Sequence, residues 1–209
     1  HFLPESDRSI PSTDGTVSVG MMRILGAFGG TARECGLTID RGQRCWAAMS
    51  HAPLLIAWHS RTGASRAMAE AARDGAGEAA RCLSAERVEP DHLLAARGYL
   101  FVCPENLAAM SGMMKDMFDR CYYPVLGRLE GRAYATVIAA GSDGEGAQRQ
   151  LDRIAKGWRL KRVADPMIVN FEAQTPERIL ADKTVPDETL KECRALGEGL
   201  AEGLSAGIF

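Results

Sequence analysis

Four residues that can contact an anion stand where an apolar segment gives way to an alanine-rich one: Ser60, Thr62, Gly63 and Ser65. Residues 53–58 have the length and apolarity of a buried strand, and residues 64–78 have a helical pattern. The order therefore predicts a strand, a tight turn and a helix N-terminus. Such a terminus offers free backbone N–H groups and partial positive charge, and the hydroxyls add donors. The segment 60–65 is thus a candidate phosphate site. The alternative is an ordinary connection in which Ser, Thr and Gly are only caps and turn formers.

The established nucleotide and hydrolase motifs do not accompany this loop. Neither Gly-x-x-x-x-Gly-Lys-Ser/Thr nor Gly-x-Gly-x-x-Gly follows the strand, which argues against ATP, GTP and a dinucleotide bound in Rossmann fashion. Residues 140–144 read Ala-Gly-Ser-Asp-Gly and do not supply the Gly-x-Ser-x-Gly of a serine hydrolase.

The remaining chain alternates strand and helix patterns. We expect strands at residues 53–58, 80–87, 98–103, 132–140 and 161–169, with Pro104 ending the third. Helices are expected between them and at residues 187–204. This predicts an α/β fold with a doubly wound, five-stranded parallel sheet and helices on both faces. Ligands of such sheets bind past the carboxyl ends of the strands, so the loops after strands one, three and four should meet.

Two further loops would join the first at that edge. Residues 104–112 follow the third strand, and the next helix carries an apolar stripe of Met and Phe that we interpret as core. Residues 141–146 follow the fourth strand and contain three glycines, which allow close approach of the backbone to a flat ring. The alternative for this third loop is a flexible turn with Asp143 as a helix cap.

The three loops together resemble a known family. Residues 60–65 resemble the Ser/Thr-x-Thr-Gly-x-Thr/Ser loop with which flavodoxin-like proteins hold the phosphate of FMN. Residues 104–120, of the form Pro-Glu-x…Ser-Gly-x-x-Lys-x-x-x-Asp-Arg, and residues 141–146 resemble the second and third flavin loops of NAD(P)H-dependent FMN and quinone reductases. The resemblance covers about residues 53–205. It departs at residues 106–109, where the family often has an aromatic residue and a glycine.

The resemblance implies an FMN-binding oxidoreductase of flavodoxin-like fold. NADH or NADPH would be the reductant, and a quinone, a nitro or azo compound, or free flavin would be the small-molecule acceptor. No acid or base residue is required, because the cofactor carries the hydride chemistry. The implied cofactor-binding residues are Ser60, Arg61, Thr62, Gly63, Ala64 and Ser65 at the phosphate, Pro104, Glu105, Asn106 and Leu107 on one side of the ring, and Gly141, Ser142, Asp143 and Gly144 on the other. Alternatives are a flavodoxin that passes single electrons to proteins, and a flavin-free interaction module.

The composition narrows the partners and the location. The formal net charge of −2 argues against nucleic acid as the main partner, and against a strongly acidic electron carrier. No apolar run is long enough to span a membrane. The six cysteines form no Cys-x-x-Cys and are typical of reduced thiols in a cytoplasmic protein. The four histidines show no metal-ligand spacing, so no metal is expected.

Three segments fall outside the simple pattern. Residues 1–48 have weak periodicity, and we expect an N-terminal extension that is flexible or artificially added, with the flavodoxin-like domain at residues 49–209. Residues 170–185 are long for a connection; they are expected to cover the flavin or to contact another subunit of a homodimer or homotetramer. The basic run at residues 149–162 is either a solvated face or a binding site for the 2′-phosphate of NADPH or an acidic partner.

Overall fold

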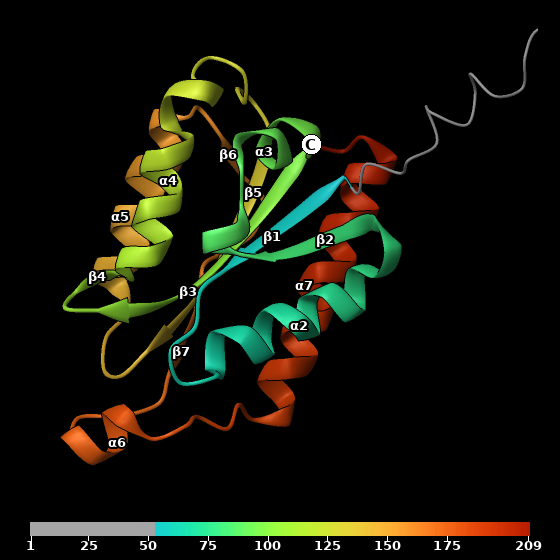
Figure 1. The fold of residues 1–209 in the computed structure, drawn as a ribbon. Coiled ribbons are helices and arrows are strands. Elements are labelled where there is room, and N and C mark those ends of the chain that lie inside the picture. The colour runs from blue at the N-terminus through green and yellow to red at the C-terminus, as the bar shows by residue number, and fades with distance from the viewer. Residues whose placement is uncertain (1–52) are drawn as a thin grey trace, which may run out of the picture. The chain divides into compact units, whose positions relative to one another are not determined.

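The computed structural model describes residues 53–209, whose fold is shown in Figure 1. The strands are β1 (Leu54–Trp58), β2 (Ala80–Ser84), β3 (Gly98–Asn106), β4 (Ala109–Met110), β5 (Ala133–Ala140), β6 (Lys161–Arg162) and β7 (Met167–Asn170). The α-helices are α2 (Ala64–Ala76), α3 (Pro90–Ala95), α4 (Gly112–Val125), α5 (Glu145–Gly157), α6 (Pro176–Leu180) and α7 (Asp187–Ala206). The extension predicted for residues 1–48 lies outside the described residues.

The strands form one sheet in the order β2-β1-β3-β5-β6, in which all neighbours are parallel. Strand β7 also pairs with β5 in parallel, while β4 pairs with β3 as an antiparallel hairpin. The predicted doubly wound parallel sheet is therefore confirmed, with β6 and β7 together taking the place of its fifth strand.

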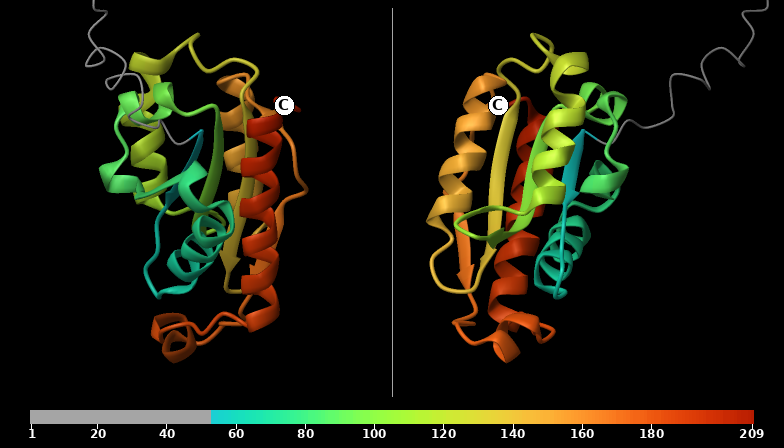
Figure 2. Two further views of the ribbon diagram at one scale, coloured as in Figure 1. Left: turned by 90° about the vertical axis from the view of Figure 1, so that its right-hand side faces the viewer. Right: turned by 60° about the vertical axis from the view of Figure 1, so that its left-hand side comes forward.

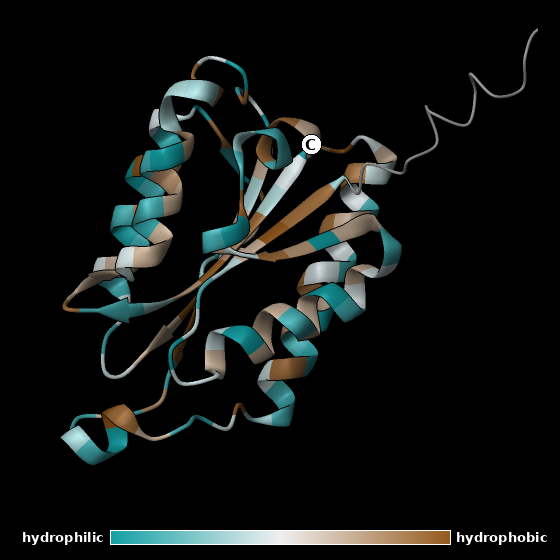
Figure 3. Cartoon of the chain, viewed as in Figure 1, coloured by the Kyte–Doolittle hydropathy of each residue, from teal (hydrophilic) through white to brown (hydrophobic). Residues whose placement is uncertain are grey.

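Helices cover both faces of the sheet, as the two views in Figure 2 show. Leu54 and Ile56 of β1 face the core beneath α2 and α7, whereas Leu55 and Ala57 face the core beneath α4 and α5. Burial on both faces explains why the central strands are continuously apolar rather than alternating. Figure 3 shows these largely apolar strands between helices that carry both polar and apolar residues.

Three strands differ from the prediction. Strand β2 ends at Ser84 instead of residue 87, because Ala85–Arg87 form a 3₁₀ turn. Proline is involved in the other two differences. The fifth strand is interrupted at residues 163–166, because Pro166 has no N–H for the ladder. The third strand continues through Pro104 to Asn106 instead of ending there. Pro104 keeps its place opposite Ala139, and its carbonyl accepts a hydrogen bond from the Ser111 N–H (3.1 Å). The chain then returns as β4, so the second loop is a hairpin.

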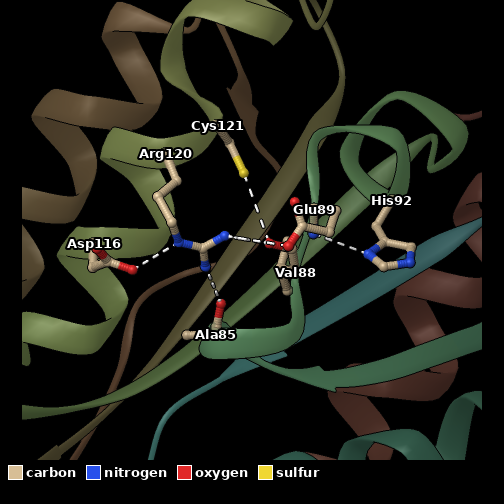
Figure 4. A network of polar contacts seen from close by, with 7 residues as sticks. All are labelled: Ala85, Val88, Glu89, His92, Asp116, Arg120 and Cys121. Carbon is tan, nitrogen blue, oxygen red and sulfur yellow. Dashed lines mark hydrogen bonds and ion pairs between the residues drawn. The ribbon is translucent and has the colours of Figure 1, made fainter.

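One arginine fastens α4, the helix after this hairpin, to the segment between β2 and α3 (Figure 4). The Arg120 guanidinium donates to the carbonyl oxygens of Ala85 (2.8 Å) and Val88 (3.1 Å), and to the Asp116 carboxylate (2.7 Å). A single cation thus satisfies backbone carbonyls of an irregular segment, which fixes that segment against the helix.

Candidate functional site

A cavity of about 620 Å³ lies at the carboxyl ends of β1, β3 and β5, as predicted for a doubly wound sheet. This volume falls in the range of small-molecule sites. Four segments line it: Arg61, Thr62 and Ala64; Pro104, Glu105, Asn106, Leu107 and Ala108; Ala139, Ala140, Gly141 and Ser142; and Phe171, Ala173, Ile179, Leu180 and Lys183. The predicted residues Ser60, Gly63, Ser65, Asp143 and Gly144 belong to the same loops but do not line the cavity.

The N-terminus of α2 is open at this cavity. Gly63 is the residue before the helix, with φ of +87°, and the first helical bond runs from the Ala67 N–H to the Gly63 carbonyl (3.0 Å). Among residues 53–209, no side chain caps this end, no acidic residue stands in its first turn, and the N–H groups of residues 64–66 have no acceptor. The helix therefore presents free donors and partial positive charge, which is the chemistry that binds an anion.

Ser65 adds an unusual donor in the first turn of α2. Its side chain is buried, and its hydroxyl has no hydrogen-bond partner among the described residues. A buried hydroxyl without a partner costs free energy, on the order of 1–3 kcal/mol. An orphaned hydroxyl beside three free N–H groups fits a phosphate that would be bound there.

The hairpin of β3 and β4 forms the second wall and carries backbone strain. Its two-residue turn consists of Leu107 and Ala108, with φ of +52° and +57°. Asn and Gly usually fill these positions, and other residues there cost on the order of 1–3 kcal/mol each. The Leu107 side chain is fully exposed at the cavity edge. Strain and an exposed apolar side chain thus coincide where a ligand would sit.

Glu105 lines the cavity but directs its charge at a different helix. Its carboxylate accepts hydrogen bonds from the N–H groups of Gly144 (2.7 Å) and Ala147 (3.3 Å) at the start of α5. The partial positive charge of α5 is therefore satisfied by the protein itself. This leaves the N-terminus of α2 as the open one of the two.

The fourth wall comes from the segment 170–185, which is long for a connection. Lys183 holds it in place: its backbone N–H donates to the Thr62 carbonyl (2.8 Å). Its ammonium group donates to the carbonyl oxygens of Arg178 (2.6 Å) and Ile179 (3.2 Å) near the end of α6. Ile179 and Leu180 remain exposed at the cavity edge, and Figure 3 shows this apolar patch on α6. The segment therefore covers one side of the cavity with apolar groups.

The side chains of His59 and Ser111 form a polar pair next to the first loop. The Nδ1 atom of His59 lies 2.9 Å from the hydroxyl of Ser111, and its Nε2 atom lies 3.9 Å from the Glu86 carboxylate. Burial lowers the pKa of His59. Ser111 is buried and precedes α4, so it is not accessible as a nucleophile. The pair connects the first loop to the end of the hairpin.

Other reactive chemistry is missing from the part of the chain that the structure describes. No cluster of three His, Cys, Asp or Glu side chains suited to a metal ion occurs within residues 53–209. The cysteines at 82, 103, 121 and 193 are free, and burial raises the pKa of the Cys103 thiol to about 12 and of Cys82 and Cys193 to about 11. Such thiols are poor nucleophiles. Within the same residues, no helix is long and apolar enough to cross a membrane.

Known proteins resemble this chain in fold, and one family model matches part of it. No curated protein matches the chain. A flavodoxin from the domain Archaea aligns with a TM-score of 0.59 at 20% identity, covering 73% of this chain and 98% of the other. A flavodoxin described as a WrbA-like protein from Agrobacterium tumefaciens gives 0.60 at 17% identity, covering 73% and 97%. A flavone reductase gives 0.57 at 18% identity, covering 73% and 62%. Residues 85–172 match the family model described as NADPH-dependent FMN reductase. The chain therefore has the flavodoxin-like fold, and its resemblance to the NADPH-dependent FMN reductases is confirmed over residues 85–172.

Proposed function

We propose that this protein is an FMN-binding oxidoreductase that uses NADH or NADPH to reduce a small acceptor such as a quinone, a nitro or azo compound, or free flavin. The observation that carries the proposal is the uncapped N-terminus of α2 at the edge of a cavity of about 620 Å³. A phosphate group fits the helix N-terminus, and a flat apolar ring fits the cavity. The match to NADPH-dependent FMN reductases supports this cofactor.

Different residues at the cavity would bind the phosphate and the ring of FMN. Thr62, Ser65 and the free N–H groups of α2 would hold the phosphate, with Arg61 adding positive charge nearby. The hairpin residues Pro104–Leu107 would border the ring on one side, and Gly141 and Ser142 on the other. When bound, FMN supplies the hydride and electron transfer itself. The exposed apolar groups of α6 would exclude water from the ring, and no side chain is assigned as an acid or base.

The first test is whether the purified full chain binds FMN. Titration should quench flavin fluorescence, and mass analysis of the released cofactor should identify FMN rather than FAD. Under anaerobic conditions NADPH or NADH should bleach the flavin absorption band, and benzoquinone should restore it. Failure of added FMN to bind would overturn the proposal.

The second candidate is a flavodoxin that passes single electrons to partner proteins. It is favoured by the solved structures described as flavodoxins, and opposed by the net charge of −2. The two functions separate in one experiment. A carrier stays oxidised with both nicotinamides, yet accepts single electrons from a reductase protein.

We further propose a homodimer or homotetramer in the cytoplasm. An assembly that covers the flavin is supported by three exposed apolar residues at the cavity edge, Leu107, Ile179 and Leu180. Light scattering of the full chain tests it, because a monomer with bound FMN would overturn it.

Residues 1–48 are proposed to be dispensable: a chain beginning at Met49 should bind FMN with the same affinity, and loss of binding would make the extension structural.

A further inference from the structure

A second hollow lies between the hairpin and α5. Its volume is about 480 Å³, and it is lined by Ala108, Gly146, Arg149, Gln150 and Arg153. Ala108 lines the first cavity as well, so the two hollows meet at the tip of the hairpin. The tip of the hairpin approaches α5 closely at Gly146, where an added Cβ would lie 2.2 Å from the Ala108 carbonyl oxygen.

Two arginines in this hollow have no carboxylate partner among residues 53–209. Arg149 and Arg153 are one helical turn apart on the exposed side of α5, so their guanidinium groups share one face. Neither lies within 4 Å of an acidic oxygen, although Glu145 precedes Arg149 by one turn. Other arginines of the same basic run are paired, Arg159 with Glu130 (3.5 Å) and Arg162 with Asp152. Among the arginines of the run, Arg149 and Arg153 are therefore the two without a carboxylate partner in residues 53–209.

A fixed amide completes the set of donors. The Oε1 atom of Gln150 accepts a hydrogen bond from the Met110 N–H in β4 (2.9 Å), which orients its side chain against the hairpin. The amide nitrogen keeps its two N–H donors. Two guanidinium groups and one oriented amide around a concave surface match a phosphate monoester, which carries close to two negative charges at neutral pH.

We propose that Arg149 and Arg153 bind the 2′-phosphate of NADPH while its nicotinamide enters the first cavity across the hairpin tip. This inference rests on the proposed function, because it gives that reaction its reductant. It makes the protein selective for NADPH over NADH, since NADH carries the pyrophosphate but lacks the monoester. Arginine suits this role because its planar fork binds phosphate oxygens in pairs.

The test measures dinucleotide fragments, with no turnover required. The double variant Arg149→Gln/Arg153→Gln is titrated by calorimetry in the full chain with 2′,5′-ADP, 5′-ADP and inorganic phosphate, at one fixed salt concentration. The matched control is Arg81→Gln/Arg87→Gln, which removes the same charge from exposed positions at β2 and the turn after it. We expect 2′,5′-ADP to bind at least about tenfold more weakly to the first variant, and within about twofold of wild type to the control.

Each other outcome overturns the proposal. Unchanged 2′,5′-ADP binding shows that the monoester is held elsewhere. Equal losses for 2′,5′-ADP and 5′-ADP show that the arginines contact the pyrophosphate or act by general charge. Inorganic phosphate that binds as tightly as 2′,5′-ADP shows a site for free phosphate rather than for a dinucleotide. FMN titration of the same samples separates this result from the proposed function, because the double variant should keep wild-type FMN affinity.

Discussion

Helices α2 and α5 each have 13 residues and follow a parallel strand, and each is preceded by a glycine in the left-handed region, Gly63 with φ of +87° and Gly144 with φ of +89°. Their first turns are filled differently. At α5 the Glu105 carboxylate accepts from the N–H groups of Gly144 and Ala147, whereas α2 receives no acceptor from residues 53–209. The same local arrangement thus yields one terminus satisfied by Glu105 and one without an acceptor from residues 53–209.

The difference arises because, within the described residues, a neighbouring strand supplies an acceptor to α5 and none to α2. Strand β3 lies between β1 and β5, and its end carries Glu105 toward α5. Beside α2, the Lys183 backbone N–H donates to the Thr62 carbonyl, while the Lys183 ammonium donates to carbonyl oxygens near the end of α6. A carboxylate would repel a phosphate, and a cation would attract it. The sheet therefore places two helix N-termini at this edge, and the surrounding side chains leave that of α2 without an acceptor from residues 53–209.

The largest effect is expected from removing the hydroxyls at the open terminus. Thr62→Ala combined with Ser65→Ala should weaken FMN binding at least tenfold, since each hydrogen bond to a charged group contributes about 1.5–3 kcal/mol. Fluorescence titration measures the affinity. Thr189→Ala/Ser205→Ala, on α7, is the matched control and should change it less than about twofold. An unchanged affinity in the first variant would place the phosphate elsewhere.

The two capping glycines should differ in their tolerance of alanine. At Gly144 an added Cβ would lie 2.4 Å from Ile168 Cγ2, so Gly144→Ala combines strain with overpacking and should lower the free energy of unfolding by about 3 kcal/mol. At Gly63 the nearest atom is the Lys183 carbonyl oxygen at 3.9 Å, so Gly63→Ala should cost only about 1 kcal/mol. Urea denaturation of the two ligand-free variants gives the comparison. Equal losses would mean that backbone strain alone accounts for both.

Removing the carboxylate from α5 should make the two termini alike. Glu105→Ala leaves the N–H groups of Gly144 and Ala147 without their acceptor, which should cost about 1–2 kcal/mol of stability. Glu105→Gln keeps one acceptor oxygen for the Gly144 N–H but loses the charge and the second oxygen, which accepts from the Ala147 N–H. Its cost should therefore lie below that of Glu105→Ala, at about 0.5–1 kcal/mol. Thermal or urea unfolding without ligand tests this order. A Glu105→Ala protein as stable as wild type would show that the cap contributes nothing.

The open terminus can be predicted from the sequence, whereas its capped counterpart cannot. Hydroxyls and a glycine between a strand and a helix form a local signal at residues 60–65. The cap of α5 comes from Glu105, 39 residues before the Gly144 N–H that it binds, so only the order of the strands reveals it. The alternative for this loop has Asp143 as the cap, but Gly144 occupies that position and no side chain of its own loop caps the helix.

For the walls of the cavity, too, the sequence predicts features set by local residues and misses those set by contacts between distant segments. The turn of Leu107 and Ala108 lacks the Asn-Gly pair that marks a two-residue hairpin, so the sequence predicts only a loop at residues 104–112. The length of the segment 170–185 predicts a cover for the flavin or a subunit contact, but the way Lys183 fixes the segment depends on carbonyl groups that carry no sequence signal. The parallel sheet is predictable, because burial on both faces makes its strands continuously apolar.

The smallest expected effect concerns Ser65 alone and is the sharpest test of an open α2 terminus. The hydroxyl is buried without a partner among the described residues, so Ser65→Ala should leave the ligand-free protein as stable as wild type or more stable by about 1 kcal/mol. The same variant should bind FMN more weakly, because the hydroxyl is then missing from the phosphate contacts. Opposite signs for ligand-free stability and FMN affinity are expected only of a group kept for a ligand. Urea unfolding and FMN titration of one preparation provide both values. A variant that loses stability while keeping its FMN affinity would assign Ser65 to the core and leave the Thr62 hydroxyl and the N–H groups of α2 as the proposed phosphate donors.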